Sequence, residues 1–208
     1  IVGYESDHHS TNPHFSQSWG LTIEPTHHTG VMSSYQLNDD IQVGLGVANT
    51  AFGSAMNAAP TNTDAKTVLA TLNYTLPENL GLLGGKTLNL GYLDGRGQFL
   101  GSQATGQPHA DNSEIEKQHF YAGIKGIQLV DKLTLGLAYD LDKVDGAAND
   151  NWSLHTYLSY QINDKTKLNL RYGYVEAPDI SGVRKRSSGV IPTQNFVPNM
   201  FRTIFGHI

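Results

Sequence analysis

Apolar and polar residues alternate one for one through most of this chain. Between residues 15 and 24, for example, Trp19, Leu21 and Ile23 are separated by small or polar neighbours. Successive side chains of a β-strand point to opposite faces, so a period of two predicts strands with one apolar and one polar face. Six segments show the pattern clearly, at residues 15–24, 41–48, 67–76, 133–141, 152–162 and 168–174, and three show it more weakly, at residues 31–37, 88–92 and 120–124. The sequence therefore predicts nine strands and requires no helix.

The connections between these strands alternate between short and long. Tyr35-Gln36-Leu37-Asn38-Asp39 and Tyr160-Gln161-Ile162-Asn163-Asp164 each lead directly into the next strand, as does the related stretch at residues 127–131. Asn and Asp favour tight hairpin turns. Longer polar, Gly-rich connections lie between them, at residues 49–66, 94–117 and 143–151 and from residue 176 onward. Short turns on one side and long loops on the other are typical of a transmembrane β-barrel.

Composition helps to decide which way the apolar face points. A soluble sandwich or lipocalin-like barrel turns its apolar face inward, whereas an outer-membrane barrel turns it toward lipid. Only 16% of the residues are charged, and the polar face carries Gly, Ser, Thr, Asn and Gln in place of the Lys and Glu usual on a solvated sheet. Aromatic residues also gather near strand ends, as in interfacial girdles; they are Trp19, Tyr35, Tyr74, Tyr92, Tyr139, Trp152, Tyr160, Tyr172 and Tyr174. We predict an all-β fold, an antiparallel up-and-down transmembrane β-barrel built as a meander of hairpins.

If lipid lies outside, the polar face lines a lumen. The side chains expected there offer hydrogen bonds at low charge density and are Ser18, Thr22, Glu24, Gln42, Thr71, Asn73, Lys125, Asp140, His155, Gln161, Asn169 and Arg171. Six glycines face the same way and leave room for water or allow the strands to curve; they are Gly44, Gly46, Gly91, Gly123, Gly136 and Gly173. Three bulky residues interrupt this face, namely Leu69, Tyr157 and Val175. A transverse field is an option if the cations Arg96, Lys125 and Arg171 face the acids Glu24, Asp140 and Asp142.

A family resemblance rests on four stretches near the start of the chain. They are Gly3-Tyr4-Glu5, Thr26-His27-His28-Thr29-Gly30-Val31, Tyr35-Gln36-Leu37-Asn38-Asp39 and Gly46-Val47-Ala48-Asn49. Together they resemble the OmpL-like β-barrel porins of diderm bacteria. The resemblance implies a monomeric or oligomeric outer-membrane channel for small hydrophilic solutes, without catalysis.

Two departures from that family shape the expected domain organisation. Family members carry strands ahead of the Gly-Tyr-Glu stretch, and outer-membrane barrels end in a strand with a terminal aromatic residue, whereas this chain stops at His207-Ile208. A bacterial single-chain barrel has an even number of strands. We expect residues 1–208 to be one β-barrel domain that lacks N-terminal strands, with residues 177–208 forming an irregular loop and a candidate final strand.

Other functions have weaker support in the sequence. An outer-membrane barrel protease or lipase could draw on Asp94, His109, Asp111 and His119, but no Ser lies in a nucleophile elbow. The pairs His8-His9 and His27-His28 would need a loop geometry that the sequence does not specify to share a metal ion. A soluble ligand-binding barrel and a surface adhesin are also compatible with strands of this kind.

The expected partners follow from charge and composition. The formal net charge is −5 without a basic stripe, which argues against a nucleic-acid partner. Cys is absent from the sequence, so neither a disulfide framework nor a thiolate metal site can form. We expect outer-membrane lipid and small hydrophilic solutes as partners, a homo-oligomer as one form of assembly, and no cofactor.

Overall fold

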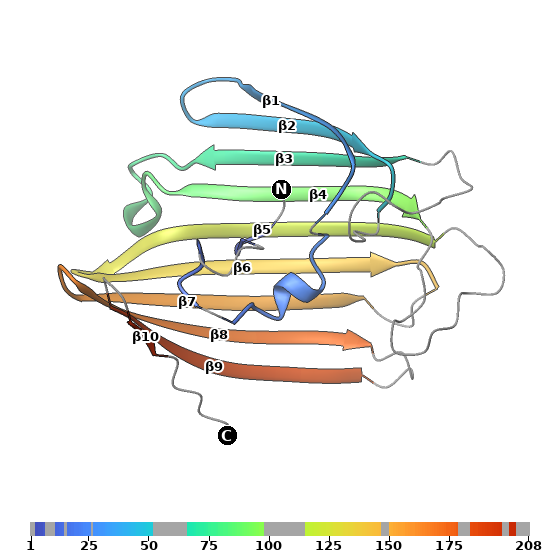
Figure 1. Ribbon diagram of the computed structural model, residues 1–208. Coiled ribbons are helices and arrows are strands. Elements are labelled where there is room, and N and C mark those ends of the chain that lie inside the picture. Colours follow the sequence, from blue (N-terminus) through green and yellow to red (C-terminus); the bar gives the residue numbers. More distant parts are fainter. Residues whose placement is uncertain are drawn as a thin grey trace.

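In the part of the chain that the structure describes, ten antiparallel strands form one sheet in which neighbours in the chain are neighbours in space (Figure 1). The computed structural model describes residues 3–6, 11–14, 16–25, 27–51, 66–97, 115–146, 150–178, 184–196 and 200–202. The strands are β1 (Gly30–Gln36), β2 (Ile41–Ala48), β3 (Thr67–Thr75), β4 (Thr87–Gly97), β5 (Ile115–Val130), β6 (Leu133–Val144), β7 (Asn151–Asn163), β8 (Thr166–Pro178), β9 (Arg184–Phe196) and β10 (Met200–Arg202). Two 3-10 turns accompany them, η2 (Gly20–Thr22) and η3 (Gly81–Leu83).

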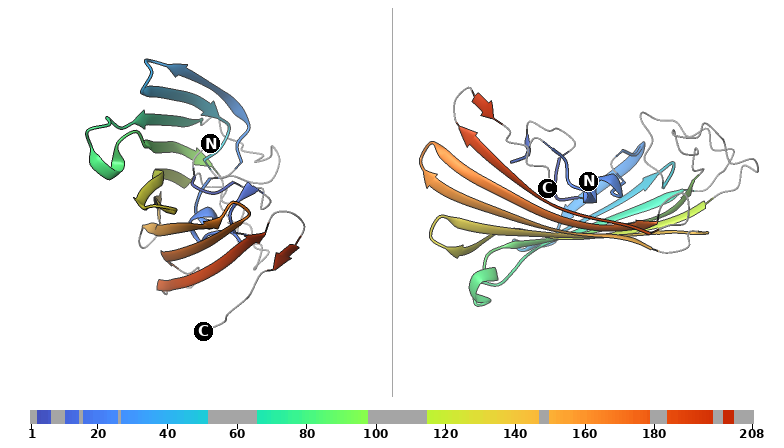
Figure 2. Two further views of the ribbon diagram at one scale, coloured as in Figure 1. Left: turned by 90° about the vertical axis from the view of Figure 1, so that its left-hand side faces the viewer. Right: turned by 90° about the horizontal axis from the view of Figure 1, so that it is seen from below.

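The sheet curves into a trough (Figure 2). Strands β1 and β10 are its two edges, and the described residues form no ladder between them. The sheet thus has the curvature of a barrel but is not closed in the described residues. This confirms the predicted all-β meander. Among the described helices, none has the length and hydropathy that crossing a bilayer would need.

The tight turns use the Asn residues that the sequence repeats. The side-chain Oδ1 of Asn38 accepts hydrogen bonds from the backbone N–H groups of Asp40 and Ile41, both at 2.9 Å. Asn163 Oδ1 accepts one from Lys165 N, also at 2.9 Å. These side chains satisfy backbone donors that a two-strand ladder leaves unpaired at its end. The short turns therefore close the hairpins β1–β2 and β7–β8 where they were predicted.

Burial alternates along the strands in the sense opposite to that of a soluble sheet. On the convex side the apolar side chains are exposed, with Val31 79% and Leu45 66% accessible. On the concave side even charged residues are almost fully buried, among them Asp140, His155 and Arg171. A soluble barrel would bury its apolar side chains inside. Because this sheet exposes them on its convex side, that architecture is excluded.

Aromatic residues of the convex side gather at two levels. Farther from the tight turns, Tyr92 of β4 packs against Phe120 of β5 with ring centroids 4.7 Å apart, and Trp152, near the start of β7, lies 5.0 Å from Tyr174. Near the tight turns, Tyr160 lies in the last pair of the β6–β7 ladder, and Tyr35 and Tyr74 lie one pair before the ends of the β1–β2 and β3–β4 ladders. Two aromatic belts with Leu and Val between them match the two interfaces of a bilayer.

One predicted strand was wrong. The described residues of the predicted strand at 15–24, which are residues 16–24, do not join the sheet but form an irregular path with the short η2 turn. Together with residues 3–6, 11–14 and 27–28 they lie against the concave side of the sheet, and we call these described residues the inner segment (Figure 2). Its backbone groups bond to sheet side chains in place of a neighbouring strand: Arg171 donates to Ser16 O and Gln17 O, and Gly20 N donates to His155. The alternation of apolar and polar residues in this segment therefore did not indicate a strand of the sheet.

Strand β9 lies within residues 177–208, where the sequence indicated irregular chain and one candidate final strand. It pairs along its whole length with β8, from Thr166 opposite Phe196 to Pro178 opposite Arg184. Its Pro192 falls inside this ladder, opposite Leu170. The sheet therefore extends past the last strand that alternation identified.

Candidate channel lumen

Buried polar side chains cover the concave side of three central strands. Alternation places Lys117 and His119 on β5, Asp140 and Asp142 on β6, and Ser153 and His155 on β7. Cross-strand register brings them together, because His119 lies opposite Asp142 and Asp140 lies opposite Ser153. We call these six residues the polar ladder.

The polar ladder is connected by short contacts from one strand to the next. Lys117 Nζ lies 3.0 Å from Asp142 Oδ1, and the His119 ring lies 3.4 Å from both Asp142 and Asp140. Ser153 Oγ donates to Asp140 Oδ2 at 3.1 Å and lies 3.4 Å from His155 Nδ1. Buried charges are tolerated when each has partners of opposite charge or hydrogen-bonding groups.

The inner segment is anchored to β8 by a buried ion pair. Arg171 Nη1 lies 2.6 Å from Glu5 Oε1, and both side chains are less than 5% exposed. The same guanidinium donates to Ser16 O and Gln17 O at 2.8 Å and to Ser16 Oγ at 3.1 Å. Glu5 Oε2 in turn accepts from Ser18 N at 2.7 Å. A guanidinium carries five N–H donors in a fixed plane, so Arg171 alone can bind two separate stretches of the inner segment.

A second anchor is aromatic. Tyr4 stacks on Tyr157 with ring centroids 3.9 Å apart and planes 8° from parallel. Gly136 lies beneath it, where a Cβ would collide with the Tyr4 hydroxyl. On its other side Lys125 Nζ donates to Tyr4 O at 2.6 Å and lies 4.2 Å from the Tyr4 ring centroid. The glycine thus makes room for the ring, and the lysine adds a cation–π contact.

Glu24 is a buried acid of the inner segment. Burial, followed by the charge of Asp140, raises the pKa of Glu24 from 4.5 to about 9. The Glu24 carboxyl lies against Gly3, where a Cβ would collide with its Oε2 atom, and Gly3 has a φ of +139°. At neutral pH this carboxyl is therefore protonated and adds no charge to the lumen.

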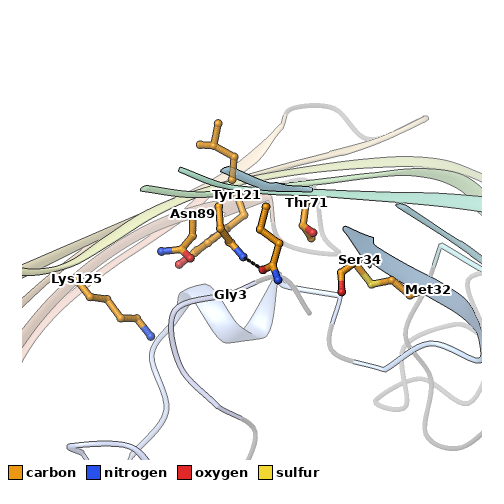
Figure 3. Close-up of a pocket in the computed structure, with 10 residues that line it drawn as sticks. Gly3, Met32, Ser34, Thr71, Asn89, Tyr121 and Lys125 are labelled. Carbon is orange, nitrogen blue, oxygen red and sulfur yellow. Dashed lines mark hydrogen bonds between the residues drawn. The ribbon is translucent and has the colours of Figure 1, made fainter. Parts of the chain in front are cut away.

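The concave side of β1–β5 holds an open cavity of about 510 Å³ (Figure 3). Its wall is mainly polar and includes Lys125 at one end and Ser34 and Met32 at the other, with Asn89, Tyr121 and Thr71 between them (Figure 3). Gln42, Asn73, Leu90 and Gly3 complete the lining. The inner segment thus fills the concave side at β6–β8, while this cavity lies at β1–β5.

Comparison with known families agrees with this geometry. The sequence profile of the family described as beta-barrel porin-2, OmpL-like, matches residues 1–199. The chain belongs to this family of β-barrel porins. No curated protein and no solved structure gave a significant match. The family accounts for the exposed apolar side of the sheet, because in a porin that side contacts lipid.

Most of the residues expected to line the lumen of this porin lie on the concave side of the sheet, but their surroundings differ. Gln42, Thr71, Asn73 and Lys125 all lie on the cavity. Asp140 and His155 belong to the polar ladder, and Arg171 binds the inner segment. Asn169 accepts a hydrogen bond from Ser159 at 2.7 Å, and Gln161 bonds to Asn163 O near the turn.

The remaining three are corrected by the course of the inner segment. Ser18, Thr22 and Glu24 were assigned to a wall strand, but they belong to the segment that lies inside the wall. Ser18 and Glu24 are buried there, and the side chain of Thr22 lies outside the described residues. Trp19 likewise belongs to the inner segment and not to an aromatic belt.

The charges that the sequence offered as an option for a transverse field pair differently in the structure. Arg96 is on the convex side and pairs with Glu116 at 3.6 Å, since both alternate with inward-facing neighbours. Arg171 pairs with Glu5, and Asp142 with Lys117. Arg96, Arg171 and Asp142 are thus each matched by a local partner and do not face one another across an opening.

Sequence reasoning missed the residues that hold the inner segment, chiefly Tyr4, Glu5 and Tyr157. A signal was present, because Tyr157 and Leu69 were bulky interruptions of the polar face. Tyr157 packs with Tyr121, Ala138 and Tyr4, and Leu69 packs with Ala48, Ala51 and Leu93. The bulk of Tyr157 thus marks the place where Tyr4 packs against the wall, whereas Leu69 packs against residues of the neighbouring strands and Ala51.

The two described residues among those named for an enzyme, Asp94 and His119, do not share a site. Asp94 accepts a hydrogen bond from Tyr92 at 2.9 Å on the convex side, whereas His119 is buried on the concave side. His109 and Asp111 lie outside the described residues, as do His8 and His9. Within the described ranges, no group of three or more His, Asp or Glu side chains has the arrangement of a metal site.

Proposed function

We propose that this chain forms the wall of an outer-membrane channel through which small hydrophilic solutes or ions diffuse passively. The single observation that carries the proposal is the inverted burial of the sheet. Val31, Leu45 and their neighbours are exposed on the convex side, while charged residues such as Asp140 and Arg171 are buried on the concave side. This distribution suits a protein with hydrocarbon outside and water inside.

The inner segment defines the width of the proposed path. It covers the concave side at β6–β8 through the Arg171–Glu5 pair and the Tyr4–Tyr157 stack. The cavity at β1–β5 is the part of the lumen left for permeation, with uncharged polar groups such as Thr71 and Asn73 on its wall. Weak, exchangeable hydrogen bonds of this kind let a polar solute enter and leave.

The test is conductance in planar bilayers, with a matched pair of substitutions on β3. Thr71 lines the cavity, and the next residue, Leu72, points to the opposite side of the strand. We expect stepwise conductance in KCl. Thr71→Trp should lower the unit conductance severalfold because it fills the cavity, whereas Leu72→Trp should leave it unchanged. Liposome swelling with sugars of increasing size gives an independent measure of the opening.

Either of two results would contradict the proposed channel. Protein that inserts into bilayers, as judged by protease protection, and yet conducts no ions would refute the channel. Equal conductance in Thr71→Trp, Leu72→Trp and the unmodified protein would show that the path does not pass the cavity.

A further inference from the structure

The cavity at β1–β5 has a distinctive set of lining groups. Its ten lining residues include three amides, Gln42, Asn73 and Asn89, and the hydroxyls of Ser34, Thr71 and Tyr121. Among these described lining residues Lys125 is the one cation, and none is an acid. Amides and hydroxyls both donate and accept hydrogen bonds, as the hydroxyl groups of a sugar also do.

Much of this hydrogen-bonding capacity remains unused by the described residues. Asn73 Nδ2 donates to Gln42 Oε1 at 2.8 Å, which leaves Asn73 Oδ1 as an acceptor and Gln42 Nε2 as a donor. Asn89 Nδ2 donates to the backbone oxygens of Thr87 and Gly123, at 3.2 and 3.4 Å, which leaves its Oδ1 as an acceptor. The wall therefore fixes the orientation of its amides and presents their remaining groups to the cavity.

Lys125 supplies a positive charge at one end of the same wall. Its ammonium has three donors, of which one goes to Tyr4 O, and its side chain is exposed. The acids that act on it electrostatically are Glu24 and Glu5. Glu5 is paired with Arg171, and burial together with the charge of Asp140 raises the pKa of Glu24 to about 9. The charge of Lys125 is thus left largely uncompensated at neutral pH.

We propose that the cavity is a binding subsite for a sugar acid, a hydroxylated carboxylate of monosaccharide size. The carboxylate would bind Lys125, and the hydroxyl groups would bind Gln42, Asn73 and Asn89. The cavity volume of about 510 Å³ is within the range of small-molecule sites. The inference deepens the proposed function and rests on it, since the subsite would lie on the permeation path and favour hydroxylated anions.

The test compares three probes of one size and different charge: glucuronate, glucose and glucosamine. Binding to the detergent-solubilised protein is measured by calorimetry, and block of the KCl current is measured in bilayers. We expect glucuronate to bind about tenfold more tightly than glucose, because one of its hydrogen bonds joins two charges. Glucosamine, which is cationic, should bind most weakly.

Substitutions separate the charge from the polar wall. Lys125→Gln should lower glucuronate affinity to that of glucose, and Asn89→Leu should weaken both while keeping the preference for the acid. Lys165→Gln, in the exposed β7–β8 turn, is the matched control and should change neither. Because Asn89→Leu leaves the contact of Lys125 with Tyr4 intact, it reports on the subsite even if Lys125→Gln disturbs the fold.

The outcomes distinguish the subsite from the channel. Equal affinity for glucuronate and glucosamine, or an unchanged preference in Lys125→Gln, would overturn the subsite. KCl conductance without binding of any probe would overturn it too and leave the channel standing. Glucuronate binding that is lost in Lys125→Gln, in a protein that conducts no KCl, would support the subsite and refute the channel.

Discussion

At the scale of single residues, the polar side chains of the concave face perform two different tasks. Arg171 and Tyr157 are used up in binding the inner segment. Gln42, Asn73 and Lys125 keep hydrogen-bonding groups directed to the cavity. The sequence predicts one class of polar residues that face inward. The structure divides this class into residues that bind the inner segment and residues that face the cavity.

The buried pair of Arg171 and Glu5 predicts a strong coupling between the two residues. Either Glu5→Gln or Arg171→Met should destabilise docking of the inner segment by about 3–5 kcal/mol, because each leaves the other charge buried and unpaired. The double variant should recover part of that loss. Hydrogen exchange of the inner segment measures the docking free energy, and purely additive losses would contradict the coupling.

Glu24 predicts a pH dependence of stability. Its pKa is raised to about 9 by burial and by Asp140, from 4.5 in the unfolded chain. The folded state therefore holds more protons between these values, so the contribution to stability is full below pH 4.5 and is lost as the pH rises toward 9. Thermal unfolding at pH 5 and pH 9 should show a larger loss in the unmodified protein than in Glu24→Gln.

The control for Glu24 is Glu78→Gln, which changes an exposed carboxyl in the β3–β4 connection. It should follow the pH profile of the unmodified protein. An identical loss of stability in Glu24→Gln and in the unmodified protein would show that another group causes the pH dependence.

At the scale of elements, alternation identified the two faces of a strand but not whether a segment belongs to the sheet. The strands β1–β8 and their Asn turns could be predicted because each carries its own period and its own turn chemistry. Residues 15–24 have the same period and lie inside the wall, since Arg171 and His155 bind their backbone. Those partners are distant in sequence, so no local pattern could show them.

Strand β6 offers a test of the two faces on one element. Leu137 is exposed on the convex side, and Thr134 points to the concave side, where it donates to Ser159 O at 3.4 Å. Leu137→Lys should cost about 2–4 kcal/mol near the middle of the membrane. Thr134→Lys should fold normally and alter ion selectivity. Unfolding in lipid vesicles measures the first effect, and equal losses in both variants would remove the assignment of faces.

At the scale of the whole molecule, the trough and the inner segment together define inside and outside. The sheet alone could be predicted as a meander, and the family resemblance agreed with the match to residues 1–199. The cavity could not be predicted, because it depends on where the inner segment stops covering the wall. Only Gln42, Thr71, Asn73 and Lys125 among the expected lumen residues line it.

The two tryptophans of the chain test this arrangement. Trp152 belongs to an aromatic belt beside Tyr174, and Trp19 lies on the inner segment with about half of its surface exposed, 49%. In Trp19→Phe, the fluorescence of Trp152 should be quenched by lipids brominated near the headgroup. In Trp152→Phe, that of Trp19 should respond to aqueous acrylamide and not to the lipids. The reverse pattern would place the sheet the other way round.

The distance in sequence between Glu5 and Arg171, 166 positions, has a consequence for how the protein matures. Every strand pairs with its neighbour in the chain, so the wall can grow one hairpin at a time. The inner segment precedes every described strand in the chain, and it cannot find its partners on β7 and β8 until those strands have formed. Closing so long a loop is entropically costly and slow. Packing of the inner segment against the sheet is thus expected to come later in biogenesis than insertion of the hairpins themselves.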